Sequence, residues 1–66
     1  MRVMVNGKIE DIEPGAGLAE LVQRCGLTPE RVAVEVNREL VRRADYARTE
    51  LREGDRVEIV TFVGGG

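Results

Sequence analysis

Apolar and polar residues alternate at the start of the chain, with the two-residue period of a half-buried strand. The apolar positions on one face are Met1, Val3 and Val5. Asn6-Gly7 follows, and this pair is the strongest short signal for a tight hairpin because both central residues of a type I′ turn need positive φ. We therefore predict a returning antiparallel strand over residues 8–13. Strict alternation fails there, since Ile9 and Ile12 have opposite parity, so we expect a bulge or an early strand end.

A helical period begins after the strand-breaking segment Pro14-Gly15-Ala16-Gly17. Apolar residues now recur at i, i+3, i+4 and i+7, which places them on one stripe of a helix. The stripe consists of Leu18, Leu21, Val22 and Cys25. Gly17 stands at the N-cap position, and Gly26 is placed to end the helix in the left-handed conformation. Because Cys25 falls on the stripe, we expect a core thiol rather than a reactive one.

The strand period returns over residues 32–36, where three valines alternate with Ala and Glu. Asn37-Arg38 can turn this strand, since Asn tolerates positive φ, and residues 39–41 would form a short returning strand. Residues 42–51 show no clear periodicity, so we predict an irregular segment. Its expected anchors to the core are Tyr46 and Leu51.

The last strand is the most strongly patterned, and the turn Glu53-Gly54-Asp55 leads into it over residues 56–63. One face carries Val57 and Ile59, and the other carries Val60 and Phe62. A single helix covers one face only, so we expect Val60 and Phe62 to form an exposed apolar patch against which partners pack. The alternatives are that Phe62 folds over a sheet edge or that residues 42–51 cover it.

These elements predict one domain over residues 1–63 and a flexible Gly-Gly-Gly tail over residues 64–66. A chain of this size buries only about 60% of the surface that it exposes when unfolded, so it builds a single core. One helix must then cover one mixed sheet of four to five strands, which is an α+β architecture of the β-grasp type. By analogy with that fold, the first and last strands lie side by side, centrally and parallel.

Composition narrows the function. An apolar fraction of 42% with 33% charged residues is that of an ordinary soluble domain, and no apolar run approaches the roughly 18–20 residues of a membrane span. The net charge of −2 and the presence of only two aromatic residues argue against binding to nucleic acid. With no His, no Ser and one Cys, the chain lacks the usual general base, metal ligands and nucleophilic dyads. We predict a cytoplasmic protein with no metal, no cofactor of its own and no catalytic residues.

The C-terminal tail offers the remaining chemistry. Three glycines reach roughly 10 Å and can enter a slot too narrow for any other sequence. One interpretation is that the carboxylate of Gly66 is a chemical handle offered to another protein's active site. The other is a frayed terminus or an expression remnant, and the tail alone leaves both open. Under the first interpretation, the predicted partner-binding residues are Val60, Phe62, Val63, Gly64 and Gly65.

Five segments spread over the whole chain carry a family resemblance. They are Val5-Asn6-Gly7, Val34-Glu35-Val36-Asn37, the loop over residues 41–46, the segment over residues 53–59, and the ending Phe62-Val63-Gly64-Gly65-Gly66. In these the chain resembles the ThiS family, ubiquitin-like β-grasp proteins that carry sulfur for thiazole formation in thiamin biosynthesis. The most specific element is a Gly-Asp turn that feeds an apolar strand ending in Gly-Gly.

The resemblance implies a chemistry in which other proteins act on the tail. A ThiF-like enzyme would use ATP to adenylate the carboxylate of Gly66, and sulfur would arrive from cysteine through a desulfurase. The resulting thiocarboxylate on Gly66 would then pass its sulfur to a ThiG-like thiazole synthase. Nothing in the chain matches a phosphate-binding G-x-x-x-x-G-K-[ST] loop, so ATP belongs to the activating partner.

Four alternatives remain open from the sequence. The chain could instead be the small subunit of molybdopterin synthase, a sulfur carrier for tRNA thiolation, or a modifier joined to other proteins. The fourth is a β-grasp interaction module that carries nothing and whose glycines are incidental.

Overall fold

The computed structural model describes residues 1–62 as one five-stranded sheet with one main helix. The elements in chain order are β1 (Arg2–Val5), β2 (Lys8–Asp11), α1 (Leu18–Arg24), the 3₁₀ helix η1 (Pro29–Arg31), β3 (Val32–Val36), β4 (Glu39–Val41), the 3₁₀ helix η2 (Arg43–Arg48) and β5 (Arg56–Thr61). The strand order is β2-β1-β5-β3-β4. Only the β1–β5 pairing is parallel, and the other three are antiparallel. The first and last strands therefore lie side by side inside the sheet, as predicted.

The first hairpin follows the sequence pattern. Asn6 has φ of 50° and Gly7 has φ of 83°, the positive values that a type I′ turn requires. β2 ends at Asp11, which confirms the early strand end. The reason is the parity of its isoleucines, because Ile9 is exposed on the strand while Ile12, just beyond it, reaches the core.

The predicted burial of Cys25 is wrong, since its side chain is exposed. The other three residues of the stripe are buried, but α1 ends at Arg24 and Cys25 is its C-cap. Gly26 then adopts φ of 75°, and the N–H of Leu27 donates to the carbonyl of Val22 at 3.2 Å. This left-handed ending turns the chain so that Leu27 is partly buried and packs against the core.

The segment predicted to be irregular contains η2. Its first turn is closed by the N–H of Asp45, which donates to the carbonyl of Arg42 at 2.8 Å. Both predicted anchors are confirmed, because Tyr46 and Leu51 are buried. A 3₁₀ helix that buries one side chain leaves no 3.6-residue stripe in the sequence, which explains why the periodicity missed it.

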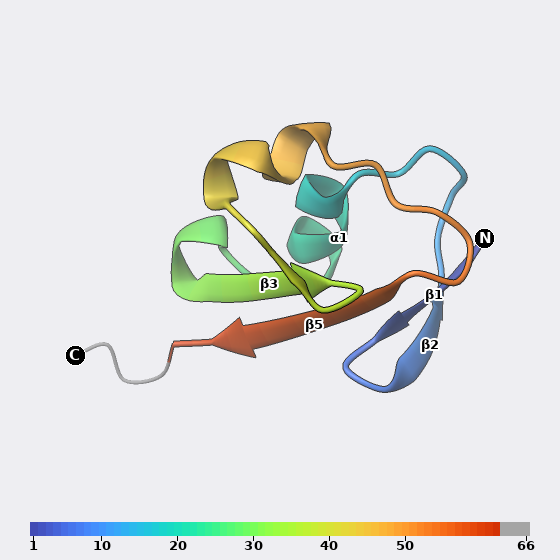
Figure 1. Cartoon of the computed structure of the whole chain (residues 1–66), viewed down its shortest axis with the longest axis horizontal. Coiled ribbons are helices and arrows are strands. Elements are labelled where there is room, and N and C mark those ends of the chain that lie inside the picture. Colours follow the sequence, from blue (N-terminus) through green and yellow to red (C-terminus); the bar gives the residue numbers. More distant parts are fainter. Residues whose placement is uncertain (63–66) are drawn as a thin grey trace.

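The core lies between one face of the sheet and the layer formed by α1 and η2 (Figure 1). Its buried residues are Val3, Val5, Ile12, Ala16, Leu18, Leu21, Val22, Val32, Val34, Tyr46, Leu51, Val57 and Ile59. They come from every strand except the two edge strands, so the sheet and the helical layer share a single core, as expected for a chain of this length. Among residues 1–62, no helix is long and apolar enough to cross a membrane.

Candidate functional site

The candidate site is the C-terminal end of β5 together with the tail that follows it. Val63 and the three glycines, Gly64, Gly65 and Gly66, lie outside the described residues. The handle role of Gly66, the partner-binding roles of the other three and the domain limit at residue 63 therefore stay predictions. The described part of the site is the strand that leads to them, with its immediate surroundings.

The two faces of β5 differ in exposure. Val57 and Ile59 face α1 and are 1% and 7% exposed, whereas Val60 and Phe62 on the opposite face are 61% and 56% exposed. Residues 42–51 do not cover Phe62, because η2 packs on the other side of the sheet with α1 (Figure 1). The predicted exposure is confirmed. We call Val60 and Phe62 the outer patch, and their partner-binding role stays a prediction.

On one side, β5 is held by a full ladder to β3. At one end of the ladder the N–H of Asn37 donates to the carbonyl of Arg56 at 2.7 Å, and at the other end the N–H of Phe62 donates to the carbonyl of Arg31 at 2.8 Å. The ladder thus continues one residue past the end of the strand. The direction of the chain is fixed as far as Phe62, two residues before the predicted tail begins at Gly64.

On the other side, the side chain of Asn6 continues the sheet after β1 has ended. The N–H of Asn6 donates to the carbonyl of Val57 at 2.9 Å. Beyond that bond the main chain turns away, and the side chain replaces it: Oδ1 accepts from the N–H of Ile59 at 2.8 Å, and Nδ2 donates to the carbonyl of Ile59 at 3.1 Å. One side chain therefore satisfies both backbone groups of Ile59, as a neighbouring strand would.

A second asparagine holds the start of β5. Asn37 has φ of 52° in the β3–β4 turn, and its Oδ1 accepts from the N–H of Arg56 at 3.0 Å. Its Nδ2 donates to Oδ1 of Asp55 at 3.0 Å, and Oδ2 of the same carboxylate accepts from the N–H of Arg52 at 2.8 Å. The turn of each hairpin thus contributes an asparagine that binds the backbone of the central strand.

These roles of Asn6 and Asn37 were not predicted from the sequence. Both were predicted to be turn residues, since Asn tolerates positive φ and is common in tight turns. The signal for more was a side chain with both a donor and an acceptor at such a turn. Its partner could not be read, because Asn6 and Ile59 lie 53 positions apart.

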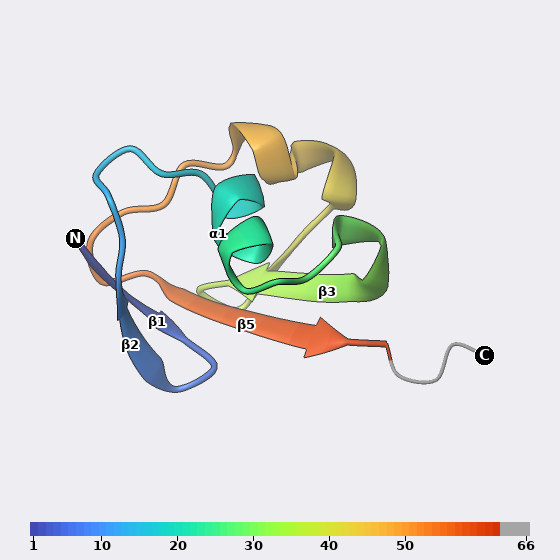
Figure 2. The same ribbon diagram turned by 180° about the vertical axis from the view of Figure 1, so that it is seen from behind.

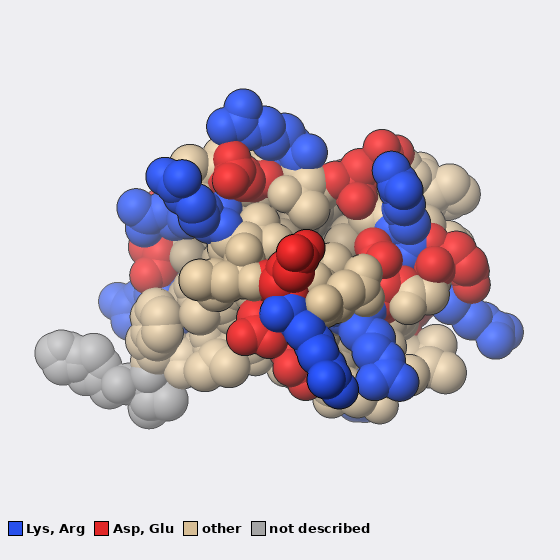
Figure 3. Space-filling model, in the orientation of Figure 1, with Lys and Arg blue, Asp and Glu red and all other residues tan. Residues whose placement is uncertain are grey.

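Charges of both signs surround the site. Figure 3 shows Lys and Arg interspersed with Asp and Glu over the visible face, with no large area of one sign. A hollow of about 450 Å³ is lined by Met4, Gly7, Glu35, Arg38, Arg56, Val57 and Glu58. Glu35 stands directly opposite Glu58 in the β3–β5 ladder, an arrangement of like charges that costs stability. Two acids and two arginines in one hollow do not make a single-sign site for a phosphate.

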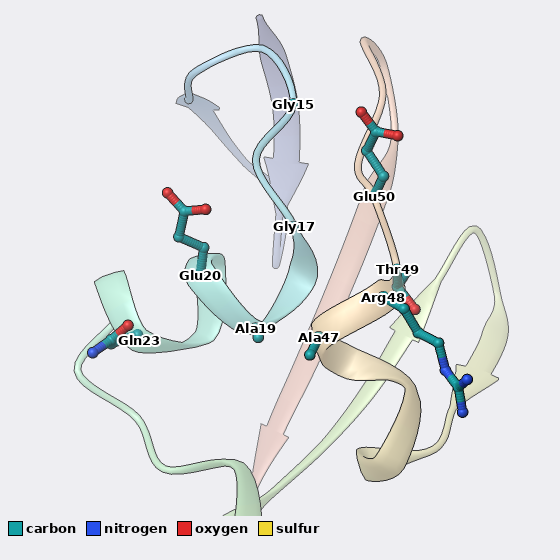
Figure 4. Close-up of a pocket in the computed structure, with 9 residues that line it drawn as sticks. All are labelled: Gly15, Gly17, Ala19, Glu20, Gln23, Ala47, Arg48, Thr49 and Glu50. Carbon is teal, nitrogen blue, oxygen red and sulfur yellow. The ribbon is translucent and has the colours of Figure 1, made fainter.

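A second hollow lies between the start of α1 and the segment that follows η2 (Figure 4). It measures about 480 Å³ and is lined by Gly15, Gly17, Ala19, Glu20, Gln23, Ala47, Arg48, Thr49 and Glu50. The side chains of Glu20, Arg48 and Glu50 point in different directions in this view, whereas ligand pockets have convergent polar groups. The hollow flanks a backbone contact, in which the N–H of Leu18 donates to the carbonyl of Thr49 at 2.8 Å.

Side-chain chemistry in the described region is sparse. Among residues 1–62, no three Cys, Asp or Glu side chains gather into a possible metal site. Burial raises the pKa of Tyr46 above its usual 10.0, while the nearby guanidinium of Arg43 acts in the opposite direction. The phenol is thus kept neutral as part of the core rather than tuned for proton transfer.

Comparison with known proteins decides the family. The sequence model of the ThiS family matches residues 3–66. The chain belongs to the ThiS family. The crystal structure of thiamine biosynthesis protein ThiS from Geobacter metallireducens superposes with a TM-score of 0.84 at 33% identity, with both chains covered in full. The predicted membership of the ThiS family and the predicted ubiquitin-like β-grasp fold are both confirmed.

Two relatives of this ThiS-family chain are longer proteins. It is 41% identical over 66 residues to a thiazole synthase of Magnetococcus marinus and 35% identical over 66 residues to a thiazole synthase of Paramagnetospirillum magneticum. All of the chain is matched in each case, but only 20% of the relative. The chain therefore spans about one fifth of the length of these two curated relatives.

Proposed function

We propose that this chain carries sulfur as a thiocarboxylate on Gly66 and donates it for thiazole formation. The observation that carries the proposal is the match to the ThiS family over residues 3–66, because the matched region includes the Gly-Gly-Gly ending. The proposal requires that Gly66 has a free α-carboxylate when the partner enzymes act. It also makes the chain a co-substrate of those enzymes rather than a catalyst.

The chemistry begins with activation, because a carboxylate is a poor electrophile. A carboxylate oxygen of Gly66 attacks the α-phosphorus of ATP, and pyrophosphate leaves. The desulfurase removes sulfur from cysteine as an enzyme persulfide, and a second thiol, such as free cysteine, reduces the persulfide and releases sulfide. The sulfide then attacks the acyl carbon of the adenylate and displaces AMP. A C–S bond replaces the C–O bond to the nucleotide, and the product is the Gly66 thiocarboxylate.

In this scheme the activating enzyme is ThiF-like and supplies ATP, and the chain binds no cofactor. The absence of His and Ser from the sequence fits a protein whose tail is worked on by others. The outer patch would pack against each partner while Val63, Gly64 and Gly65 occupy the slot that leads to the active site. The cytoplasmic location stays a prediction.

A ThiG-like thiazole synthase is the proposed acceptor of the sulfur. Two thiazole synthases contain a region similar to the whole of this chain within a protein about five times as long. That association supports thiazole formation over the alternatives of molybdopterin synthesis, tRNA thiolation and protein modification. The match to the ThiS family also favours a carrier over a plain interaction module.

Intact-mass measurement tests the handle. After incubation with the activating enzyme, Mg-ATP, a cysteine desulfurase and cysteine, the chain should gain the mass difference between one sulfur and one oxygen atom. Deletion of Gly66 should abolish the change, whereas Glu30→Gln, an exposed substitution in η1, should not. An unchanged mass with an enzyme shown to adenylate its own carrier would overturn the proposal.

Pyrophosphate release tests the outer patch. Phe62→Asp should lower kcat/KM for adenylation by about tenfold or more, because a charge replaces an apolar anchor at the interface. Ile9→Asp is the matched control, since Ile9 is a similarly exposed apolar residue on β2. A folded Phe62→Asp variant that is adenylated at the normal rate would remove the patch from the proposed interface.

A further inference from the structure

The backbone groups of β5 point alternately to its two neighbours. Arg56 and Phe62 exchange hydrogen bonds with the β3 side, so the even-numbered residues of the strand face β3. In an antiparallel pair the residues between them face the other way. The N–H and C=O groups of Val57, Ile59 and Thr61 therefore point to the side of β5 on which β1 lies.

On this side, β5 has hydrogen-bond partners only as far as Ile59. The N–H of Asn6 donates to the carbonyl of Val57, and the side chain of Asn6 bonds to both the N–H and the C=O of Ile59. Thr61 is the next residue whose backbone points to this side. Within residues 1–62, no group donates to its carbonyl or accepts from its N–H. Figure 2 shows β5 running on past the tip of the β1–β2 hairpin, which leaves this edge open.

The open edge lacks the features that usually protect a strand edge. Edges of sheets are commonly blunted by charged residues or proline, and the two outer strands carry such charges, with Lys8, Glu10 and Asp11 on β2 and Glu39 on β4. Residues 60–62 carry none, and Thr61 is flanked by the exposed side chains of the outer patch. This stretch is chemically suited to receive another strand.

We propose that an extended segment of the thiazole synthase adds to β5 as a strand, on the side where β1 lies and beyond the end of β1. Its backbone would bond to the N–H and the C=O of Thr61, while its side chains pack beside the outer patch. Such strand addition gives affinity through main-chain hydrogen bonds and specificity through alternate side chains. The identity of the partner rests on the proposed function.

The position of Thr61 along the chain also favours this enzyme as the occupant. Thr61 precedes Gly66 by five residues, and five extended residues span at most roughly 18 Å. An enzyme that holds Gly66 in its active site must therefore bring the mouth of that site close to the open edge. The thiazole synthase is the enzyme proposed to take sulfur from Gly66, and the relatives that contain a region like this chain are themselves thiazole synthases.

Amide hydrogen exchange followed by NMR tests the pairing on the unmodified chain. In the free protein, the Thr61 amide should exchange fast and the Phe62 amide slowly. Saturation with thiazole synthase should slow Thr61 by about tenfold or more, as for an amide that gains a stable hydrogen bond. The outward-facing amide of Leu40 on β4 should not change. Fast exchange at Thr61 in the saturated complex overturns the inference, as does protection by the activating enzyme alone.

Two further outcomes are distinguishable. Protection of Thr61 that grows with the concentration of the chain alone would assign the edge to a second copy and overturn the inference. If thiazole synthase does not bind the chain at all, the proposed function itself fails. Binding without protection of Thr61 removes only the strand addition.

Thr61→Pro provides a second test, because it removes an N–H that the fold does not use, at an edge where proline is tolerated. Its Kd for thiazole synthase should rise by about tenfold, since the partner's carbonyl loses its donor. Leu40→Pro is the matched control, as it removes an outward-facing N–H on the edge strand β4, and its Kd should not change. A folded Thr61→Pro variant that binds normally contradicts the inference, and if this variant does not fold, the exchange experiment decides.

Discussion

The two faces of β5 carry similar side chains but meet different surroundings. Val57 and Ile59 are closed off by α1 and the rest of the core, whereas Val60 and Phe62, one and three positions further along, are more than half exposed. A single strand therefore supplies both the centre of the core and the exposed outer patch that we propose as a binding surface. The direction of the side chain alone separates stability from the proposed binding, so neighbouring substitutions should have unrelated effects.

The largest difference is expected between Ile59→Ala and Val60→Ala. Ile59→Ala opens a cavity in the core and should lower the free energy of unfolding by about 2–5 kcal/mol. This is a large share of the roughly 3–10 kcal/mol expected for a domain of this size. Val60→Ala should cost less than about 1 kcal/mol, which is the range of strand propensity at exposed positions. Urea unfolding of both variants measures the difference, and similar losses would show that the outer face is not a free surface.

A smaller effect should follow from removing the Asn6 side chain. Asn6→Gly keeps positive φ accessible but loses both bonds to Ile59, so the free energy of unfolding should fall by about 1–2 kcal/mol. Asn6→Ala should lose about 1–2 kcal/mol more, because alanine is strained at φ of 50°.

Amide exchange shows whether the loss is local to the β1 side of β5. In Asn6→Gly, the Ile59 amide should exchange faster while the Phe62 amide, bonded to Arg31 on the other side, changes little. An Asn6→Gly variant as stable as the parent would mean that the side chain adds nothing to the strand pairing.

The smallest expected effect is a pH dependence of the free energy of unfolding, which arises from Tyr46 in the core. Burial raises the pKa of Tyr46 in the folded chain above its unfolded value of 10.0, so the folded state holds the phenol proton more tightly. The resulting stabilisation is present below pH 10 and is lost as the pH rises through the folded pKa.

The free energy of unfolding of the parent should therefore fall more steeply than that of Tyr46→Phe as the pH rises above about 9. Tyr46 is the only tyrosine, so its ionisation can be followed directly by ultraviolet absorbance. Equal slopes for the two proteins would show that the phenol is as hydrated in the folded chain as in the unfolded one.

Much of the fold could be predicted because its elements have simple periods. Two-residue alternation identified β1, β3 and both faces of β5, and the stripe that begins at Leu18 identified α1. The turns at Asn6-Gly7 and Asn37-Arg38 were readable because positive φ restricts the residue types that fit. The strand order came from analogy with the fold, since periodicity specifies elements and not their neighbours.

The errors have physical causes. Cys25 continues the helical stripe in sequence, but α1 ends before it, at Arg24, and the left-handed turn at Gly26 sets this boundary. η2 has no stripe to detect. At the candidate site, the exposure of Val60 and Phe62 could be predicted because a single helix covers only one face of the sheet. The hydrogen bonds of Asn6 and Asn37 could not, because they depend on contacts that exist only in the folded chain.

The parallel pairing of β1 with β5 has a consequence for folding kinetics. Two central strands come from opposite ends of the described chain, and the bond between Asn6 and Ile59 joins positions 53 residues apart. Pairings of high sequence separation slow folding, because a long loop must close before the contact forms. During synthesis, neither the core nor the outer patch can form until Arg56–Thr61 has emerged. A partly synthesised chain is therefore also an unfolded one, because the strand at the centre of its sheet is not yet in place.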